Sequence, residues 1–103
     1  MKEDILKIIQ NYGISNQLRK FTEECFELEE AIITHELKKS VEYEIPLTEI
    51  IGTKEHIAEE IADVMVMLEQ FKNYYGISSE EITRIFWSKV YRQLDRIEKE
   101  QEK

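Results

Sequence analysis

Residues 17–32 read QLRKFTEECFELEEAI, and this stretch decides the fold. Its apolar residues recur three and four positions apart, the spacing that aligns side chains on one face of a helix. A second stretch, HIAEEIADVMVMLEQF at residues 56–71, has the same spacing. The aligned residues are Leu18, Phe21, Cys25, Leu28 and Ile32 in the first stretch and Ile57, Ile61, Val64, Leu68 and Phe71 in the second. We predict two central helices, over about residues 16–38 and 54–75, and an all-α fold.

Helix-ending and helix-starting residues divide the rest of the chain. Gly13 is expected to end a short first helix, because glycine accepts the left-handed conformation found there. Ser15 then caps the second helix, and Gly76 ends the third. Ser78, followed three residues later by Glu81, forms a capping box that opens a fourth helix. Residues 1–103 therefore read as a single domain of the four-helix-bundle type, small enough that partner subunits would help its stability.

The connection between the two central helices, KSVEYEIPLTEIIGT at residues 39–53, has a different character. Residues 41–45, VEYEI, alternate like a β-strand. Pro46 forbids a helix interior, and Gly52 permits a turn. Connections of this length are uncommon in compact domains and are often functional. The segment could cover a site, pair with another subunit or only span a gap.

Composition excludes several classes of protein. The chain has 22 acidic and 14 basic residues, giving a net charge of −8, which would repel a nucleic-acid backbone. We expect neither nucleic-acid binding nor membrane insertion, since no run of eighteen apolar residues occurs, and the acidic N-terminus is unlike a signal peptide. A cytoplasmic location is expected. The single cysteine, Cys25, has no partner for a disulfide and is expected to be a small core residue.

Four acids lie beside the apolar faces of the central helices. Glu60 falls on the apolar side of its helix, with Asp63 one turn further on, and Glu24 and Glu27 border the apolar face of the other helix. Antiparallel packing would bring all four together. One such pair would suggest an ordinary solvated face, but two pairs favour a site, because like charges at about 4 Å repel by roughly 4 kcal/mol. All-oxygen ligation suits Mg²⁺, or Mn²⁺ as a substitute.

These acids stand in two motifs, Glu23-Glu24-Cys25-Phe26-Glu27 and Glu60-Ile61-Ala62-Asp63. Together with the sequence pattern of both central helices, these motifs resemble those of the MazG-like all-α nucleoside triphosphate pyrophosphohydrolases. That family carries an EExxE motif on one helix and an ExxD motif on the next. The all-α dUTPases and phosphoribosyl-ATP pyrophosphatases share this scheme. A di-iron bundle would require Glu-x-x-His steps, which His35 and His56 do not provide.

The resemblance implies a function and a set of site residues. Glu24, Glu27, Glu60 and Asp63 would bind Mg²⁺, and Glu23 is a weaker candidate for orienting or deprotonating the attacking water. The substrate would be a nucleoside triphosphate, cleaved between its α and β phosphates to the monophosphate and pyrophosphate. A homodimer or homotetramer and a role in nucleotide-pool sanitation are also implied. The alternative function is a non-catalytic helical module that binds a partner helix.

Two further groups of residues are candidates for substrate binding. A basic face in the fourth helix could hold the triphosphate, or could be a solvated face or part of ion pairs. It consists of Lys89, Arg92 and Arg96. Four aromatic residues could stack on a base, although aromatic residues at helical spacing are more often core or interface. These are Tyr43, Tyr74, Tyr75 and Trp87.

Overall fold

The computed structural model describes residues 2–102, and nearly all of them are helical. The helices are α1 (Lys2–Tyr12), α2 (Ile14–Lys39), α3 (Leu47–Tyr74) and α4 (Ser79–Gln101), with one 3₁₀ turn, η1 (Glu42–Glu44). The described part of the chain contains no strand, so the prediction of an all-α fold is confirmed. Within residues 2–102, no helix combines the length and the apolar character that crossing a bilayer requires.

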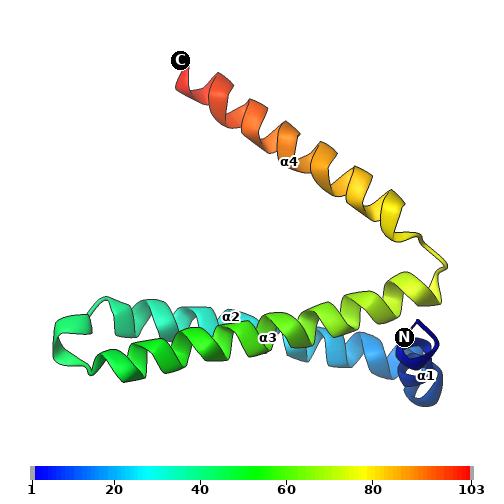
Figure 1. The fold of residues 1–103 in the computed structure, drawn as a ribbon, viewed down its shortest axis with the longest axis horizontal. Helices are drawn as coiled ribbons and strands as arrows, with labels where there is room; N and C mark the ends of the chain where they lie inside the picture. The colour runs from blue at the N-terminus through cyan, green and yellow to red at the C-terminus, as the bar shows by residue number, and fades with distance from the viewer. Residues whose placement is uncertain (1, 103) are drawn as a thin grey trace.

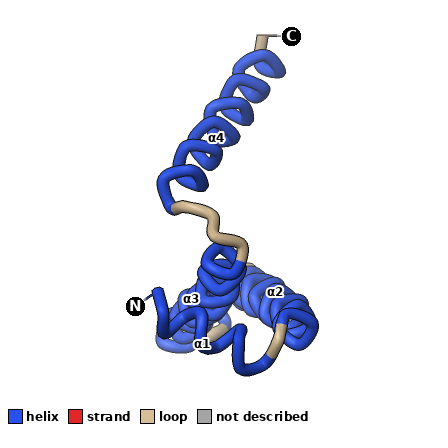
Figure 2. Tube along the Cα trace, turned by 90° about the vertical axis from the view of Figure 1, so that its right-hand side faces the viewer, coloured by secondary structure: helices blue, strands red, loops and turns tan. Residues whose placement is uncertain are grey.

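α2 and α3 form an antiparallel hairpin, and α1 packs across its open end (Figures 1 and 2). The buried apolar residues join these three helices: Ile9 of α1, Ala31 of α2, and Ile50 and Met67 of α3. The rings of Phe21 and Phe71 add an edge-to-face contact with centroids 5.4 Å apart. The acids of α2 and α3 are therefore carried on facing helices, as predicted.

The residues that face the hairpin interior differ from the predicted apolar stripes. Gln17, Glu24 and Ala31 are the buried residues of α2, and they are seven positions apart. In α3 the buried residues are Ile50, Glu60, Met67 and Gln70. Leu18 and Ile32, by contrast, are exposed, as are Ile61 and Leu68. The predicted stripes thus flank the seam between the helices, and polar side chains occupy much of the seam itself.

α4 leaves the hairpin after residue 78 and extends away from it (Figure 1). Among residues 79–101 none is buried, and only Val90 is half-buried. Seven large apolar residues on this helix are exposed: Ile82, Ile85, Phe86, Trp87, Tyr91, Leu94 and Ile97. A single chain therefore leaves an amphipathic helix uncovered.

The connection between α2 and α3 is shorter than predicted. The strand-like alternation at residues 41–45 does not form a strand, because η1 lies here and no neighbouring strand among residues 2–102 exists to pair with it. Pro46 caps α3 at its N-terminus, so α3 begins at Leu47, and Gly52 lies inside the helix rather than in a turn. Lys38 and Glu49 form an ion pair of 2.8 Å across this end. The segment closes the hairpin.

The predicted helix ends are partly confirmed. Gly76 has φ +66 and follows the end of α3, and the Ser78 hydroxyl accepts a hydrogen bond of 3.1 Å from the Glu81 backbone N–H. Ser15 was wrongly predicted as a cap, since α2 begins at Ile14 after Gly13 at φ +87. The prediction for Cys25 was also wrong, because this side chain is exposed. Its position on the apolar stripe places it beside the seam rather than in it.

Two glycines offer a matched test of the backbone. Gly52 is helical, and a Cβ there would meet nothing within 4 Å, so Gly52→Ala should stabilise the protein by about 0.5–1 kcal/mol. Gly76 also has open space around it, but its φ of +66 disfavours a Cβ, so Gly76→Ala should destabilise by about 1 kcal/mol. Urea unfolding of both variants checks these opposite signs, and equal effects would contradict the helix boundaries.

Candidate metal centre

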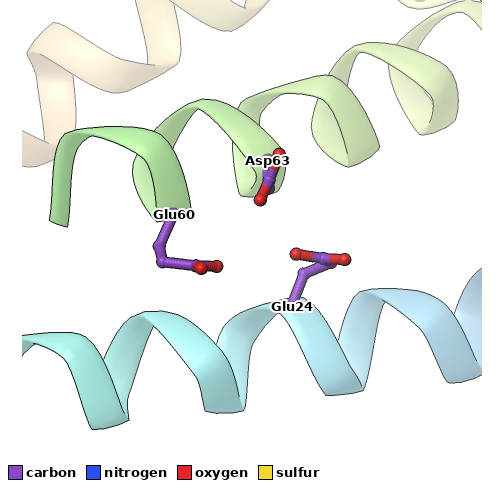
Figure 3. Close-up of side chains that lie close together, drawn as sticks. All are labelled: Glu24, Glu60 and Asp63. Atoms are coloured by element: carbon purple, nitrogen blue, oxygen red, sulfur yellow. The ribbon is translucent and has the colours of Figure 1, made fainter. Parts of the chain in front are cut away.

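Three carboxylates meet halfway along the α2–α3 seam. Glu24 extends from α2, and Glu60 and Asp63 extend from successive turns of α3 (Figure 3). One oxygen of each can be chosen so that all three lie within 4.8 Å of one another. The structure thus brings together three of the four acids predicted as metal ligands. Glu60 and Asp63 are three residues apart and so lie on the same side of α3. In the antiparallel hairpin this side of α3 faces Glu24 on α2.

Burial makes this cluster costly for the protein. Glu24 is 6% exposed and Glu60 is 8% exposed. The Oε2 atoms of both residues are buried without a hydrogen-bond partner. Native structures leave few buried polar atoms unpartnered, and an unpaired carboxylate oxygen is among the most expensive. The three carboxylates could hold a metal ion here, and oxygen donors alone are the ligands that Mg²⁺ and Mn²⁺ prefer.

The other oxygens of the cluster do have partners. Lys20 Nζ lies 2.9 Å from Glu24 Oε1, one helical turn earlier on α2. This hydrogen bond and the negative charge of Glu24 raise the pKa of Lys20. His56 Nε2 lies 3.6 Å from Glu60 Oε1, also one turn earlier in its helix. Glu24 thus has one oxygen paired with Lys20, whereas Glu60 has only a long contact with His56, an ion pair only when the imidazole is protonated.

Glu27 lies outside the three-carboxylate cluster, but the negative charges of the cluster change its pKa. Its pKa is raised first by the negative charge of Glu24, then by loss of solvation and by the charge of Glu60. The side chain is exposed, which leaves it able to turn toward a cation. The structure therefore places the fourth predicted ligand beside the site without including it in the cluster.

Two clefts flank the cluster. The first, of about 560 Å³, lies between α1, α2 and α3, and both Glu24 and Asp63 line it. The second, of about 810 Å³, lies against α2 and α3 and is lined by Glu27, His56 and Glu60. Both volumes fall in the range of small-molecule sites. The exposed Glu23, predicted as a weak candidate for handling water, lines the first cleft.

The predicted substrate-binding residues lie apart from the acids in a single chain. Lys89, Arg92 and Arg96 are exposed on α4 and line neither of the two clefts. The four aromatic candidates are also exposed and line neither cleft: Tyr43, Tyr74, Tyr75 and Trp87. The cations and the aromatic ring that do line the first cleft are Arg19, Lys20 and Tyr12.

Sequence reasoning missed several residues at this site. Gln17 and Gln70 are buried on the seam and were not singled out, since glutamine is usually a surface residue. Lys20 had a readable signal, because it stands four residues before Glu24, the spacing of a helical ion pair. His56 stands at the same spacing before Glu60.

Comparison of the chain with known protein families, with curated proteins and with solved structures gives no match. The resemblance to the MazG-like enzymes therefore rests on residues 23–27 and 60–63 and on the sequence pattern of the two helices that carry them. The clustering of Glu24, Glu60 and Asp63 is a separate, geometric observation.

Removing one of the buried charges should stabilise the metal-free protein. Glu60→Gln leaves the side-chain shape almost unchanged, removes repulsion within the cluster and is expected to raise the free energy of unfolding by about 1 kcal/mol in EDTA. Added Mg²⁺ should stabilise the wild type and leave this variant little changed. Urea unfolding with and without Mg²⁺ measures both effects.

Glu55→Gln is the control, because Glu55 is exposed on the same helix. It should change neither the stability in EDTA nor the response to Mg²⁺. A loss of stability in Glu60→Gln, together with a full Mg²⁺ response, would identify Glu60 as a structural residue instead of a ligand.

Proposed function

We propose that this protein is a Mg²⁺-dependent nucleoside triphosphate pyrophosphohydrolase. One observation carries the proposal: two buried carboxylates, Glu24 and Glu60, lie beside Asp63 and keep oxygens without partners. A purely structural role would not sustain such a cluster in a small domain, because repulsion and desolvation both oppose it. The motifs that hold these acids support the same function by their resemblance to the MazG-like enzymes.

Glu24, Glu60 and Asp63 would hold the metal, and Glu27 would complete the ligand set from the neighbouring turn of α2. Mn²⁺ would be a substitute, since it accepts the same oxygen ligands. Mg²⁺ commonly binds through a few carboxylates and the phosphates of a substrate, and this arrangement suits a cluster that opens to a cleft.

The reaction adds one water across the α–β anhydride bond and gives a nucleoside monophosphate and pyrophosphate. Bound Mg²⁺ would supply polarisation of the phosphoryl oxygens and a bound water of lowered pKa. Glu23, which lines the cleft, would orient this water or accept its proton. Lys20 would contact the phosphates once a cation replaces it at Glu24. Sanitation of the nucleotide pool fits such an activity.

We further propose that the enzyme is a homodimer or homotetramer. The uncovered apolar face of α4 supports this, since exposed apolar patches of this extent mark interaction sites. A second copy would complete the four-helix bundle. It would also give Lys89, Arg92 and Arg96 a route to the triphosphate, because α4 of one chain could reach the cleft of another.

A charge placed on the apolar face of α4 tests the oligomer. Leu94→Glu should reduce the molar mass in solution to that of the 12.4 kDa chain, because Leu94 is exposed on α4 and contributes to no buried core of the single chain. Ser88→Glu, on the opposite side of the helix, should leave the mass unchanged. Light scattering after gel filtration measures both, and a monomeric wild type would contradict the proposal.

The alternative function is a non-catalytic helical module. The same exposed face of α4 favours it, since an amphipathic helix can bind a partner helix without any chemistry. In that case the acids would hold no nucleotide, and Mg²⁺ with nucleotide would leave the melting curve unmoved.

Pyrophosphate release separates the two functions. A panel of ribo- and deoxynucleoside triphosphates with Mg²⁺ should give release from the wild type, and Glu60→Ala and Asp63→Ala should each lower the rate by at least a hundredfold. Glu55→Ala, exposed on the same helix, should retain the wild-type rate. Release that survives in both site variants, or no release from any folded protein, would exclude this carboxylate mechanism.

A further inference from the structure

The first cleft has a chemistry of its own beyond the acids at its edge. We propose that it is the nucleoside subsite and that the buried amide of Gln17, held in place by Gln70, reads the edge of the base. This assignment rests on the proposed function for the position of the phosphates, but the binding of a nucleoside can be measured without any reaction.

The cleft runs along the seam and changes character along its length. Gln17 is seven residues before Glu24 on α2, and Gln70 is seven residues after Asp63 on the antiparallel α3. Seven residues of helix span about 10 Å, comparable to the length of a nucleoside. Carboxylates and Lys20 thus lie at one end, and two amides lie at the other, next to α1. A nucleotide with its phosphates at the acids would place its base at the amides.

The amide pair is buried and has a defined orientation. Gln17 is 6% exposed and Gln70 is 1% exposed, and Gln17 Nε2 donates a hydrogen bond of 2.7 Å to Gln70 Oε1. Gln70 Nε2 in turn faces the sulfur of Met67 at 3.7 Å. Flipping both amides would bring Gln70 Oε1 to the sulfur, where it would lose this contact, so the observed orientation is favoured.

This orientation leaves a hydrogen-bond acceptor at the cleft. Within residues 2–102 no group donates to Gln17 Oε1, and Gln17 lines the cleft. Asn16, also at this end, donates its Nδ2 to the Tyr12 carbonyl at 2.7 Å, and its own Oδ1 is left as a second acceptor. Two acceptor oxygens at the amide end select a ligand edge that carries N–H donors. The exocyclic amino or ring N–H groups of a nucleobase provide such an edge.

The walls between the polar ends suit a flat ring. Tyr12, Ile8 and Val66 line the cleft, and they come from two different helices. Aromatic and aliphatic side chains on either side of a base contribute stacking and exclude water. The second cleft also has apolar walls, from Phe26 and Ile33, but its polar lining includes Glu27, Glu30 and His56 and neither buried glutamine. The nucleoside is therefore assigned to the first cleft.

The first experiment is an NMR titration of ¹⁵N-labelled protein with a panel of ribo- and deoxynucleosides in EDTA. At least one nucleoside should shift the side-chain amide signals of Gln17 and Gln70. Gln17→Met keeps the side-chain length and should weaken binding about tenfold, the loss of roughly one hydrogen bond. Gln93→Met, exposed on α4, should bind as the wild type does.

A second variant protects the test against misfolding of Gln17→Met. Val66 is 48% exposed, so Val66→Trp should fill the cleft from its rim without disturbing the core. It should abolish nucleoside binding.

With inorganic triphosphate, which has no base, hydrolysis by Gln17→Met should match the wild type, whereas its KM for the preferred nucleotide should rise about tenfold.

The outcomes separate the cleft from the reaction. Shifts of the Gln17 side-chain amide signals without any hydrolysis would support the nucleoside subsite and contradict the proposed pyrophosphohydrolase activity. Hydrolysis with no nucleoside shift at Gln17 or Gln70, or with shifts only around His56 in the second cleft, would overturn the subsite and leave the reaction standing. An equal loss on inorganic triphosphate and on nucleotides in Gln17→Met would also overturn the reading of the base.

Discussion

The burial of like charges between two helices is the constraint on which the rest of this structure depends. Glu24 and Glu60 occupy seam positions that an ordinary helical hairpin would give to leucine or alanine. Each loses solvation there, and each is close to Asp63. Lys20 offsets part of the cost from the preceding turn of α2, but it contacts only one oxygen of Glu24. The hairpin is thus built around a site that a divalent cation would stabilise.

That constraint has a consequence for the core. With Gln17, Glu24, Glu60 and Gln70 on the seam, the buried apolar residues among residues 2–102 are few: Ile9, Ala31, Ile50 and Met67. The apolar stripes flank the seam and remain partly exposed, and α4 is uncovered along its length. A domain of this size has little stability to spare. Association through these faces would bury apolar surface and so replace the apolar burial that is missing from the seam, where polar side chains stand. The polar seam would thus account for both the acidic site and the proposed oligomer.

The sequence predicted the elements with clear local signals and missed those that depend on packing. Periodicity identified the central helices, and Gly76 with Ser78 identified the break before α4, because these signals act within one or two turns. The strand-like alternation at residues 41–45 formed no strand, because a short alternating segment needs a partner strand to pair with. Glu24, Glu60 and Asp63 were predicted from their position beside apolar residues. The Gln17–Gln70 pair was not predictable, since its members are 53 residues apart and only the register of the hairpin joins them.

Glu27 shows how the site couples charge to folding. Its pKa is raised in the folded protein, chiefly by Glu24, so the proton binds more tightly in the folded than in the unfolded state. The stability that this proton contributes is complete below the unfolded pKa and is lost as the pH rises through the folded pKa. In the folded chain Lys20 is the cation in contact with Glu24. A bound divalent cation would shift the pKa of Glu27 in the opposite direction, because it favours the ionised form of every carboxylate around it. Binding would release Lys20 from Glu24 at the edge of the first cleft, where a phosphate could become the next partner of its ammonium group.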